Sequence, residues 1–167
     1  MKNSILYTAL STSLLLGVGC QTKEYSVWPL DEVCSVEFPI LDKADAKAAL
    51  LGDWQWQQTR YPGQSRLTGV VPTETPRSTG HQLLFRFTAD RYLILKDGNV
   101  VQDLPYEVRY WGEGTNTVDP ILLVRTYQAA TGFSGGSILR IDPGKQCLQL
   151  VNSYGDAGGD LSLKKTK

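Results

Sequence analysis

Three cysteines are the residues whose positions most directly suggest chemistry. Cys20 closes an apolar stretch and follows the small residues Gly17-Val18-Gly19, whereas Cys34 and Cys147 lie far apart in the chain. A thiol placed like Cys20 suits covalent lipid attachment, and the other two predict a disulfide if the chain reaches an oxidising compartment. That bridge would close a loop of more than a hundred residues and stabilise the fold by about 4–5 kcal/mol. The alternative is two buried thiols whose Cα atoms never come within about 7 Å.

The first 19 residues have the features of a secretory signal. Lys2 supplies a positive start, and the apolar run that follows is too short and too interrupted by Ser and Thr to span a membrane. The small residues before Cys20 resemble the lipobox cut by the lipoprotein signal peptidase, with Gly17 where that pattern usually has Leu. We expect residues 1–19 to be a lipoprotein signal peptide, Cys20 to carry acyl chains such as palmitate, and residues 20–41 to be a lipidated tether. An ordinary secretory peptide cut nearby is the alternative.

Acylation at Cys20 would place the protein in the cell envelope. Each buried CH₂ of an acyl chain contributes about 0.8 kcal/mol, so two or more chains give stable membrane attachment. Gln21 follows the cysteine, where inner-membrane lipoproteins typically have Asp. We therefore expect a lipid anchor in the outer membrane of a cell with two membranes, with its periplasmic or surface orientation left open.

Catalytic and metal-binding patterns are weak in this chain. His81 is the single histidine, no metal-ligand spacing surrounds it, and no Gly-x-Ser-x-Gly elbow is present. Carboxylates do not cluster among apolar residues as in a glycosidase pair. The Gly158-Gly159 segment, flanked by Asp156 and Asp160, misses the EF-hand spacing. We expect no enzyme activity, no cofactor and no metal site.

The balance of charges argues against nucleic-acid binding. Because the predicted signal contains only Lys2, the mature part has 16 basic and 17 acidic residues. The basic residues gather only at Lys164, Lys165 and Lys167, and counterion displacement needs a longer basic stripe. Nucleic acid is therefore excluded as the expected partner.

One short helix and a series of strands must position these residues. Asp42–Leu51 is Ala-rich, begins with a capping Asp and stops before Gly52, which predicts a helix. The alternating segments that follow predict eight strands. The predicted strands are Asp53–Arg60, His81–Thr88, Arg91–Lys96, Asn99–Tyr110, Ile121–Tyr127, Ser137–Ile141, Gln146–Val151 and Asp160–Lys165. Trp54, Trp56 and Gln58 should share one face of the first strand, and Asp97-Gly98 predicts a tight hairpin.

Short hairpins without intervening helices favour an antiparallel sheet that closes on itself. The expected fold class is all-β: an eight-stranded antiparallel up-and-down barrel over residues 42–167 with one short N-terminal helix. Tyr61–Gly80 is the exception to the short connections, since it is about twenty residues rich in Pro, Gly and Thr. A loop this long is typical of a functional lid or of disorder, and here it would lie across one mouth of the barrel.

The segment Gly52-Asp53-Trp54, placed after the predicted helix and opening the first strand, resembles the G-x-W signature of the lipocalins. The wider pattern is similar to the bacterial lipocalin-like lipoproteins of the calycin type over roughly residues 50–165. It includes Thr75-Pro76-Arg77-Ser78-Thr79-Gly80, Phe85-Arg86-Phe87-Thr88-Ala89-Asp90, Tyr92 and Lys96-Asp97-Gly98-Asn99-Val100-Val101. The resemblance implies a lipocalin-type barrel in a family whose members mostly lack an assigned ligand.

Barrel closure gives several residues a structural role. The last strand would lie beside the first, so that Lys165 could reach across the indole of Trp54 next to Gly52 and close that end. Lipocalins usually place an Arg in this role. Leu148 and Leu150 should face inward, so Cys147 should face outward, where a segment that carries Cys34 and wraps the barrel could meet it.

Two hypotheses for function remain. In the first, the barrel holds one small apolar or amphipathic molecule, with the loop 61–80 as its lid. The candidate lining residues are Trp56, Phe85, Phe87, Tyr92, Ile94, Tyr106 and Val108. The same side chains would equally form a dry packed core.

In the second hypothesis the barrel is filled, and the loops bind an envelope protein, for example as an inhibitor of a hydrolase or as an assembly factor. Trp111–Gly114 and Thr131–Gly136 each place an aromatic residue beside glycines. A small-molecule binder would co-purify with an apolar compound, whereas a partner-binding protein would be empty and would capture a protein.

Overall fold

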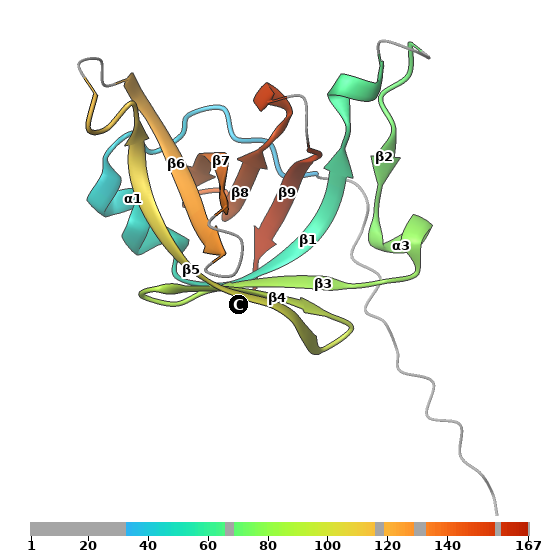
Figure 1. Cartoon of the computed structure of the whole chain (residues 1–167). Coiled ribbons are helices and arrows are strands. Elements are labelled where there is room, and N and C mark those ends of the chain that lie inside the picture. The colour runs from blue at the N-terminus through green and yellow to red at the C-terminus, as the bar shows by residue number, and fades with distance from the viewer. Residues whose placement is uncertain (1–32, 66–68, 116–118, 129–132, 156–157, 167) are drawn as a thin grey trace, which may run out of the picture.

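The computed structural model describes residues 33–65, 69–115, 119–128, 133–155 and 158–166 (Figure 1). Cys20 and the predicted signal peptide lie outside these residues, as does most of the predicted tether. The described part is a β-structure with short helical segments.

Eight antiparallel strands form a closed up-and-down barrel, which confirms the predicted fold class. The strands are β1 Gly52–Arg60, β3 Leu83–Phe87, β4 Arg91–Lys96, β5 Asn99–Trp111, β6 Asp119–Gln128, β7 Phe133–Asp142, β8 Cys147–Val151 and β9 Asp160–Lys165. Each strand pairs with the next one along the chain, and β9 returns to pair with β1 from Trp54 opposite Lys165 to Arg60 opposite Asp160. Closure leaves no long free edge at which another chain could pair.

The tightest hairpin of the barrel is the one predicted between β4 and β5. Asp97 and Gly98 have φ angles of 52° and 84°, the left-handed conformations that a two-residue turn of this type requires. Aspartate tolerates that conformation and glycine adopts it without a steric cost.

Helix α1, Lys43–Leu50, covers one end of the barrel. Asp42 caps it, since its side chain accepts a hydrogen bond of 2.9 Å from the backbone N–H of Asp45. Ala46 and Leu50 are fully buried against the barrel interior. The shorter helical segments are η1 Pro62–Gln64, α3 Pro76–Thr79 and η2 Ser153–Gly155.

The long connection after β1 adds a ninth strand to the sheet. Strand β2, Thr73–Glu74, pairs with Thr59 and Arg60 of β1. Strand β2 can pair there because β3 pairs with β1 only from Gly52 to Gln55, which leaves the same side of β1 available at Thr59 and Arg60. Figure 1 shows β2 and α3 standing beyond β1, and not across the interior where a lid was expected.

A bulge in β1 changes which side chains face inward. The pairing with β9 shifts between Trp56 and Gln58, so Thr59 turns into the barrel and is 8 % exposed. The expectation that Gln58 shares a face with Trp54 and Trp56 is therefore wrong. Thr59 instead accepts a hydrogen bond of 2.9 Å from the indole N–H of Trp56.

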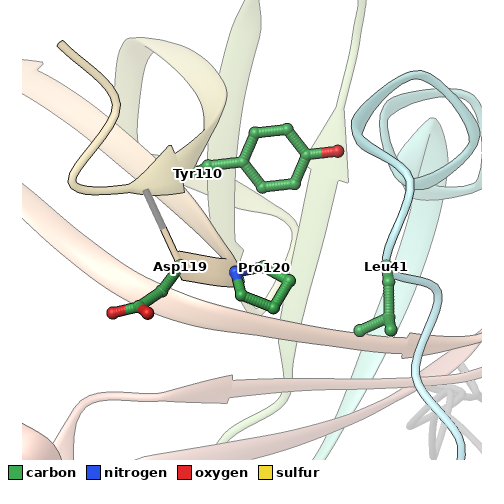
Figure 2. A pocket seen from close by; sticks show the side chains of 4 residues that line it. All are labelled: Leu41, Tyr110, Asp119 and Pro120. Atoms are coloured by element: carbon green, nitrogen blue, oxygen red, sulfur yellow. The ribbon is translucent and has the colours of Figure 1, made fainter. Parts of the chain in front are cut away.

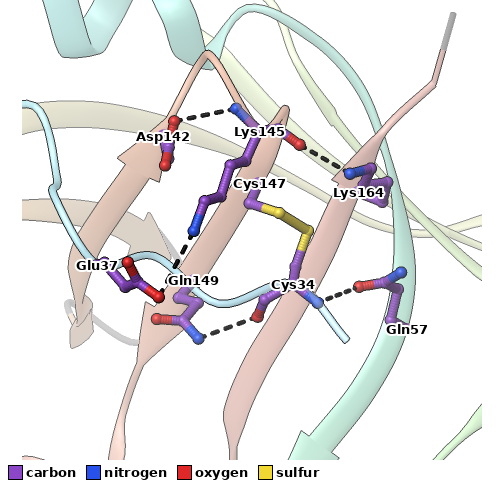
Figure 3. Close-up of a disulfide and its surroundings, with 8 residues drawn as sticks. All are labelled: Cys34, Glu37, Gln57, Asp142, Lys145, Cys147, Gln149 and Lys164. Carbon is purple, nitrogen blue, oxygen red and sulfur yellow. Dashed lines mark hydrogen bonds and ion pairs between the residues drawn. A yellow bond between two sulfur atoms is a disulfide. The ribbon is translucent and has the colours of Figure 1, made fainter. Parts of the chain in front are cut away.

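The predicted disulfide between Cys34 and Cys147 is present, with Cα atoms 5.3 Å apart (Figure 3). Residues 33–41, here called the strap, run along the outside of the barrel. The carbonyl of Cys34 accepts a hydrogen bond from Gln149, and the carbonyl of Val36 accepts one from Arg140. Cys147 therefore faces outward as strand alternation predicted, and the strap buries it to 3 % exposure.

Candidate functional site

The residues predicted to line a pocket come together inside the barrel. Six of the seven are at most 9 % exposed, and Ile94 is partly buried against them. The six are Trp56, Phe85, Phe87, Tyr92, Tyr106 and Val108. Low exposure means that little water-sized space touches these side chains, so most of them act as core residues in this structure.

Two aromatic rings at the core of this cluster, those of Tyr92 and Tyr106, pack against the ring of Phe87. Its ring centre lies 4.9 Å from that of Tyr92 and 5.4 Å from that of Tyr106, the latter in an edge-to-face arrangement. Phe85 lies 6.0 Å from Tyr92. Such contacts stabilise a core by about 0.5–1.5 kcal/mol each beyond simple burial.

Most interior aromatic residues that carry a polar group have a hydrogen-bond partner for it. The indole of Trp54 donates to the carbonyl of Leu50 at 2.7 Å, and the hydroxyl of Tyr106 donates to the carbonyl of Thr88 at 2.7 Å. The indole of Trp56 is satisfied by Thr59. Satisfying these groups removes the cost of burying them.

Tyr92 differs from these residues. This residue is 8 % exposed and packs against Phe85 and Phe87. No described residue hydrogen-bonds to its hydroxyl, and since none of the buried side-chain oxygens of these residues lacks a partner, this oxygen retains contact with solvent. Burial raises the pKa of this hydroxyl, so it stays protonated at neutral pH and can donate one hydrogen bond. The interior therefore offers one polar contact that the described part of the chain does not use.

Burial decreases away from this aromatic cluster. Leu83, Ile94 and Leu161 pack against the core but are only partly buried. Leu83 and Leu161 lie toward the ends of β3 and β9 away from Phe87 and Lys165, and Ile94 lies in the middle of β4 opposite Phe85. Ile40, Ala49 and Tyr110 are partly buried at the α1 end, so partial burial occurs at both ends of the barrel.

The covered end of the barrel has the arrangement that the strand order predicted. The ammonium group of Lys165 lies 5.1 Å from the centre of the Trp54 ring and donates a hydrogen bond of 2.9 Å to the carbonyl of Ala49. Gly52 has a φ of 111°, and an added Cβ would lie 3.6 Å from Cε of Lys165. A side chain at position 52 would therefore be strained by its backbone.

Residues considered for catalysis lie on the surface. His81 hydrogen-bonds through Nδ1 to Asp97 at 2.8 Å, and both side chains are more than 40 % exposed. Among the described residues, no serine, threonine or cysteine side chain hydrogen-bonds to the His81 ring. No group of three or more His, Cys, Asp or Glu residues in the described part of the chain could hold a metal ion.

A shallow depression of about 250 Å³ lies where α1 begins beside the β5–β6 hairpin. Leu41, Tyr110, Asp119 and Pro120 line it, and Figure 2 shows the Asp119 carboxylate pointing away from the Tyr110 ring. The hydroxyl of Tyr110 accepts a hydrogen bond of 3.2 Å from the backbone N–H of Lys43. With one apolar wall and no converging polar groups, this depression is a weak candidate for a ligand site.

An exposed aromatic pair lies on the outside of the barrel. The rings of Trp111 and Tyr154 meet edge to face with centres 5.1 Å apart, and the side chains are 37 % and 45 % exposed. The hydroxyl of Tyr154 donates to the carbonyl of Gly136 at 2.9 Å, which holds the η2 segment against β7. Sequence reasoning singled out Trp111 but missed Tyr154, because no local pattern indicates that η2 folds back onto the barrel wall.

Comparisons with protein-family models, with curated proteins and with solved structures find no match for this chain. Within the described residues, no helix has the length and apolar character needed to cross a membrane. The fold itself, a closed eight-stranded barrel, is compatible with a calycin-like architecture.

Proposed function

We propose that this chain is a lipid-anchored protein of the bacterial cell envelope whose lipocalin-like barrel binds one small amphipathic molecule. Residues 1–19 would direct export, Cys20 would carry the lipid, and residues 20–41 would tether the barrel to the outer membrane. The closed barrel, the Cys34–Cys147 disulfide and the lipobox-like sequence before Cys20 support this proposal.

The observation that carries the binding proposal is the unpartnered hydroxyl of Tyr92. A ligand that covers this hydroxyl must offer it an acceptor, because burying a hydroxyl without a hydrogen bond costs about 1–3 kcal/mol in protein mutational data. A ligand with one acceptor beside an apolar body would satisfy this hydroxyl and contact Phe85 and Ile94 at the same time. Partly buried residues beside the cluster, such as Ile94 opposite Phe85, would give such a molecule its approach.

The packing of the interior limits what can bind. Phe85 and Phe87 are each 2 % exposed, so the aromatic cluster leaves no room for a large ligand without rearrangement. The proposed ligand is therefore small, or it enters by displacing partly buried side chains such as Ile94 and Leu161.

Native mass spectrometry tests the binding proposal. The full chain, produced in its own organism with Cys20→Ser so that it is released without lipid, should carry a small molecule that is lost on denaturation. Tyr92→Phe should reduce its occupancy, whereas Val101→Thr, on an exposed part of β5, should not. A clean ligand-free mass under gentle conditions would contradict the proposal.

The anchor is tested separately. Wild-type protein should partition with membranes and show added acyl mass at Cys20, and Cys20→Ser protein should lose both properties. Membrane partitioning that persists in Cys20→Ser, without any loss of mass, would overturn the lipid attachment while leaving the barrel proposal intact.

The exposed pair Trp111 and Tyr154 favours a second function, in which the outer wall binds an envelope protein. Tryptophan and tyrosine are enriched at the energetic centres of protein interfaces. If this function holds, the chain should capture one protein from solubilised envelopes, and Trp111→Ser should abolish the capture without changing the thermal unfolding midpoint. Capture that is unchanged by Trp111→Ser would rule out this surface.

A further inference from the structure

A polar pocket of about 270 Å³ lies on the outer wall of the barrel, separate from the interior. Its polar lining comes from β1, β7, β8 and β9. The lining residues are Gln58, Arg60, Arg140, Gln149, Asp160 and Ser162, together with Val151 and Leu161.

The register of four strands builds this pocket. Arg140 lies opposite Gln149, Gln149 opposite Ser162, and Ser162 opposite Gln58, so that four side chains form one straight row across the sheet. In the adjacent row Arg60 lies opposite Asp160. Directly opposed residues have Cβ atoms about 5 Å apart, which places their polar ends within reach of one small ligand.

The strap fixes two members of the row. Arg140 donates through Nη2 to the carbonyl of Val36 at 2.7 Å. Gln149 donates through Nε2 to the carbonyl of Cys34 at 3.2 Å, as Figure 3 shows. Because the disulfide holds the strap in place, these two side chains are oriented before any ligand arrives. The contact with Val36 uses one of the five N–H groups of the Arg140 guanidinium, so the other four do not take part in it.

Two further groups in the pocket have no partner among the described residues. No described residue hydrogen-bonds to the hydroxyl of Ser162, and since none of their buried side-chain oxygens lacks a partner, this hydroxyl opens onto the pocket that Ser162 lines. Arg60 lies directly across from Asp160, yet the ion pairs of the described residues do not include one between them. A serine hydroxyl and a guanidinium are thus both available at the same small space.

Asp160 does not neutralise this site by itself. Its carboxylate is turned to the β8–β9 connection, where it accepts hydrogen bonds from the backbone N–H groups of Asn152 and Ser153 and from the Ser153 hydroxyl, each 2.9 Å long. The pocket is lined by the guanidinium groups of Arg60 and Arg140 and by a single carboxylate, that of Asp160. Its net charge is therefore positive.

From this arrangement we propose that the outer-wall pocket binds an oxyanion group, a carboxylate or a phosphate, of a small molecule. The planar fork of an arginine matches both groups, and charge-assisted hydrogen bonds are about twice as strong as neutral ones. Arg60 and Arg140 would hold the oxygens, and Ser162 would donate one further hydrogen bond. This site lies outside the barrel and does not depend on the proposed interior ligand.

The test is an NMR titration of the ¹⁵N-labelled full chain carrying Cys20→Ser, with inorganic phosphate and with succinate, and with sodium chloride as the control for charge. At least one oxyanion should saturate, with shifts confined to residues 58–60, 139–141, 149–151 and 160–162. The oxyanion that saturates at the lower concentration identifies the group that the pocket prefers. Saturation by phosphate and succinate at equal concentration would support a site for either oxyanion.

Matched variants decide whether the pocket is responsible. Arg60→Gln should weaken binding at least about tenfold and Ser162→Ala by a smaller factor. Arg77→Gln, on the exposed helix α3, and the interior variant Tyr92→Phe should leave the affinity unchanged. Shifts that do not saturate, or equal weakening by Arg60→Gln and Arg77→Gln, would overturn the proposal.

Discussion

The ammonium group of Lys165 lies 5.1 Å from the centre of the Trp54 ring, at the seam where the last strand of the barrel pairs with the first. The same group donates to the carbonyl of Ala49 at the end of α1, so one side chain joins β9, β1 and the helix. Trp54 in turn donates to the carbonyl of Leu50. This pair closes the covered end of the barrel and links sheet closure to helix docking.

Replacing Lys165 by Met should destabilise the barrel. The change keeps the length and apolar stem but removes the cation above Trp54, worth about 0.5–2 kcal/mol, and the charged hydrogen bond to Ala49, worth about 1.5–3 kcal/mol. We expect the free energy of unfolding, measured in urea, to fall by about 2–5 kcal/mol in total. Lys165→Arg should recover much of this loss. Lys164→Met, whose side chain faces outward to the carbonyl of Lys145, is the matched control and should change stability much less.

Tyr92 and Tyr106 should respond differently to the same substitution. Tyr106→Phe removes a hydrogen bond of 2.7 Å to the carbonyl of Thr88 and should lower the free energy of unfolding by about 1 kcal/mol. Tyr92→Phe removes a hydroxyl that hydrogen-bonds to no described residue and retains contact with solvent, so the ligand-free protein should be about as stable as wild type. Urea unfolding of both variants measures the contrast. A large loss in Tyr92→Phe would mean that this hydroxyl has a partner, and the binding proposal would lose its main support.

Sequence patterns predicted the fold well where structure depends on neighbouring residues. The alternation of Phe85 and Phe87, the Asp97-Gly98 turn and the capping Asp42 all act within a few residues, and the structure has the elements that they indicate. The outward orientation of Cys147 followed from the same period-two argument. Local chemistry was sufficient for these features because each one is determined inside a single strand or turn.

Features that depend on pairing between distant segments were missed. The bulge in β1 arises only where β1 meets β9, so the sequence around Gln58 and Thr59 alone does not indicate it. The polar row through Ser162 requires the register of four strands. Two of them, β1 and β9, are paired in the barrel but are its first and last strands in the sequence. Likewise, the contact between Trp111 and Tyr154 depends on where η2 folds. Tertiary register, and not residue type, decides such sites.

Removing the Cys34–Cys147 disulfide should weaken the fold without changing its topology. The bridge spans a sequence separation of 113 residues, for which the chain-entropy model gives about 4–5 kcal/mol. The Cys34→Ser, Cys147→Ser double variant should therefore unfold at a clearly lower urea concentration while keeping the β-sheet circular dichroism of wild type. Because the strap orients Arg140 and Gln149, this variant should also bind oxyanions more weakly at the outer-wall pocket. Unfolding at the wild-type urea concentration would show that the bridge contributes little to stability.

The ion pair between Asp53 and Arg86 should make stability depend on acid pH. Two hydrogen bonds of 2.6 and 2.7 Å join the carboxylate to the guanidinium, and they hold the pKa of Asp53 below its ordinary value of 3.8. A group whose pKa is lower in the folded than in the unfolded state stabilises the fold above the unfolded pKa, and this contribution disappears as pH falls through the folded pKa. Urea unfolding at pH 7 and at pH 2.5 should therefore show a smaller loss of stability on acidification for Asp53→Asn than for wild type. Arg86→Gln should reduce the pH dependence in the same way, since it returns the pKa of Asp53 toward its ordinary value. In a protein that already carries Asp53→Asn, adding Arg86→Gln should not change the pH dependence further. Equal pH dependence in wild type and Asp53→Asn would show that this pair does not contribute to acid sensitivity.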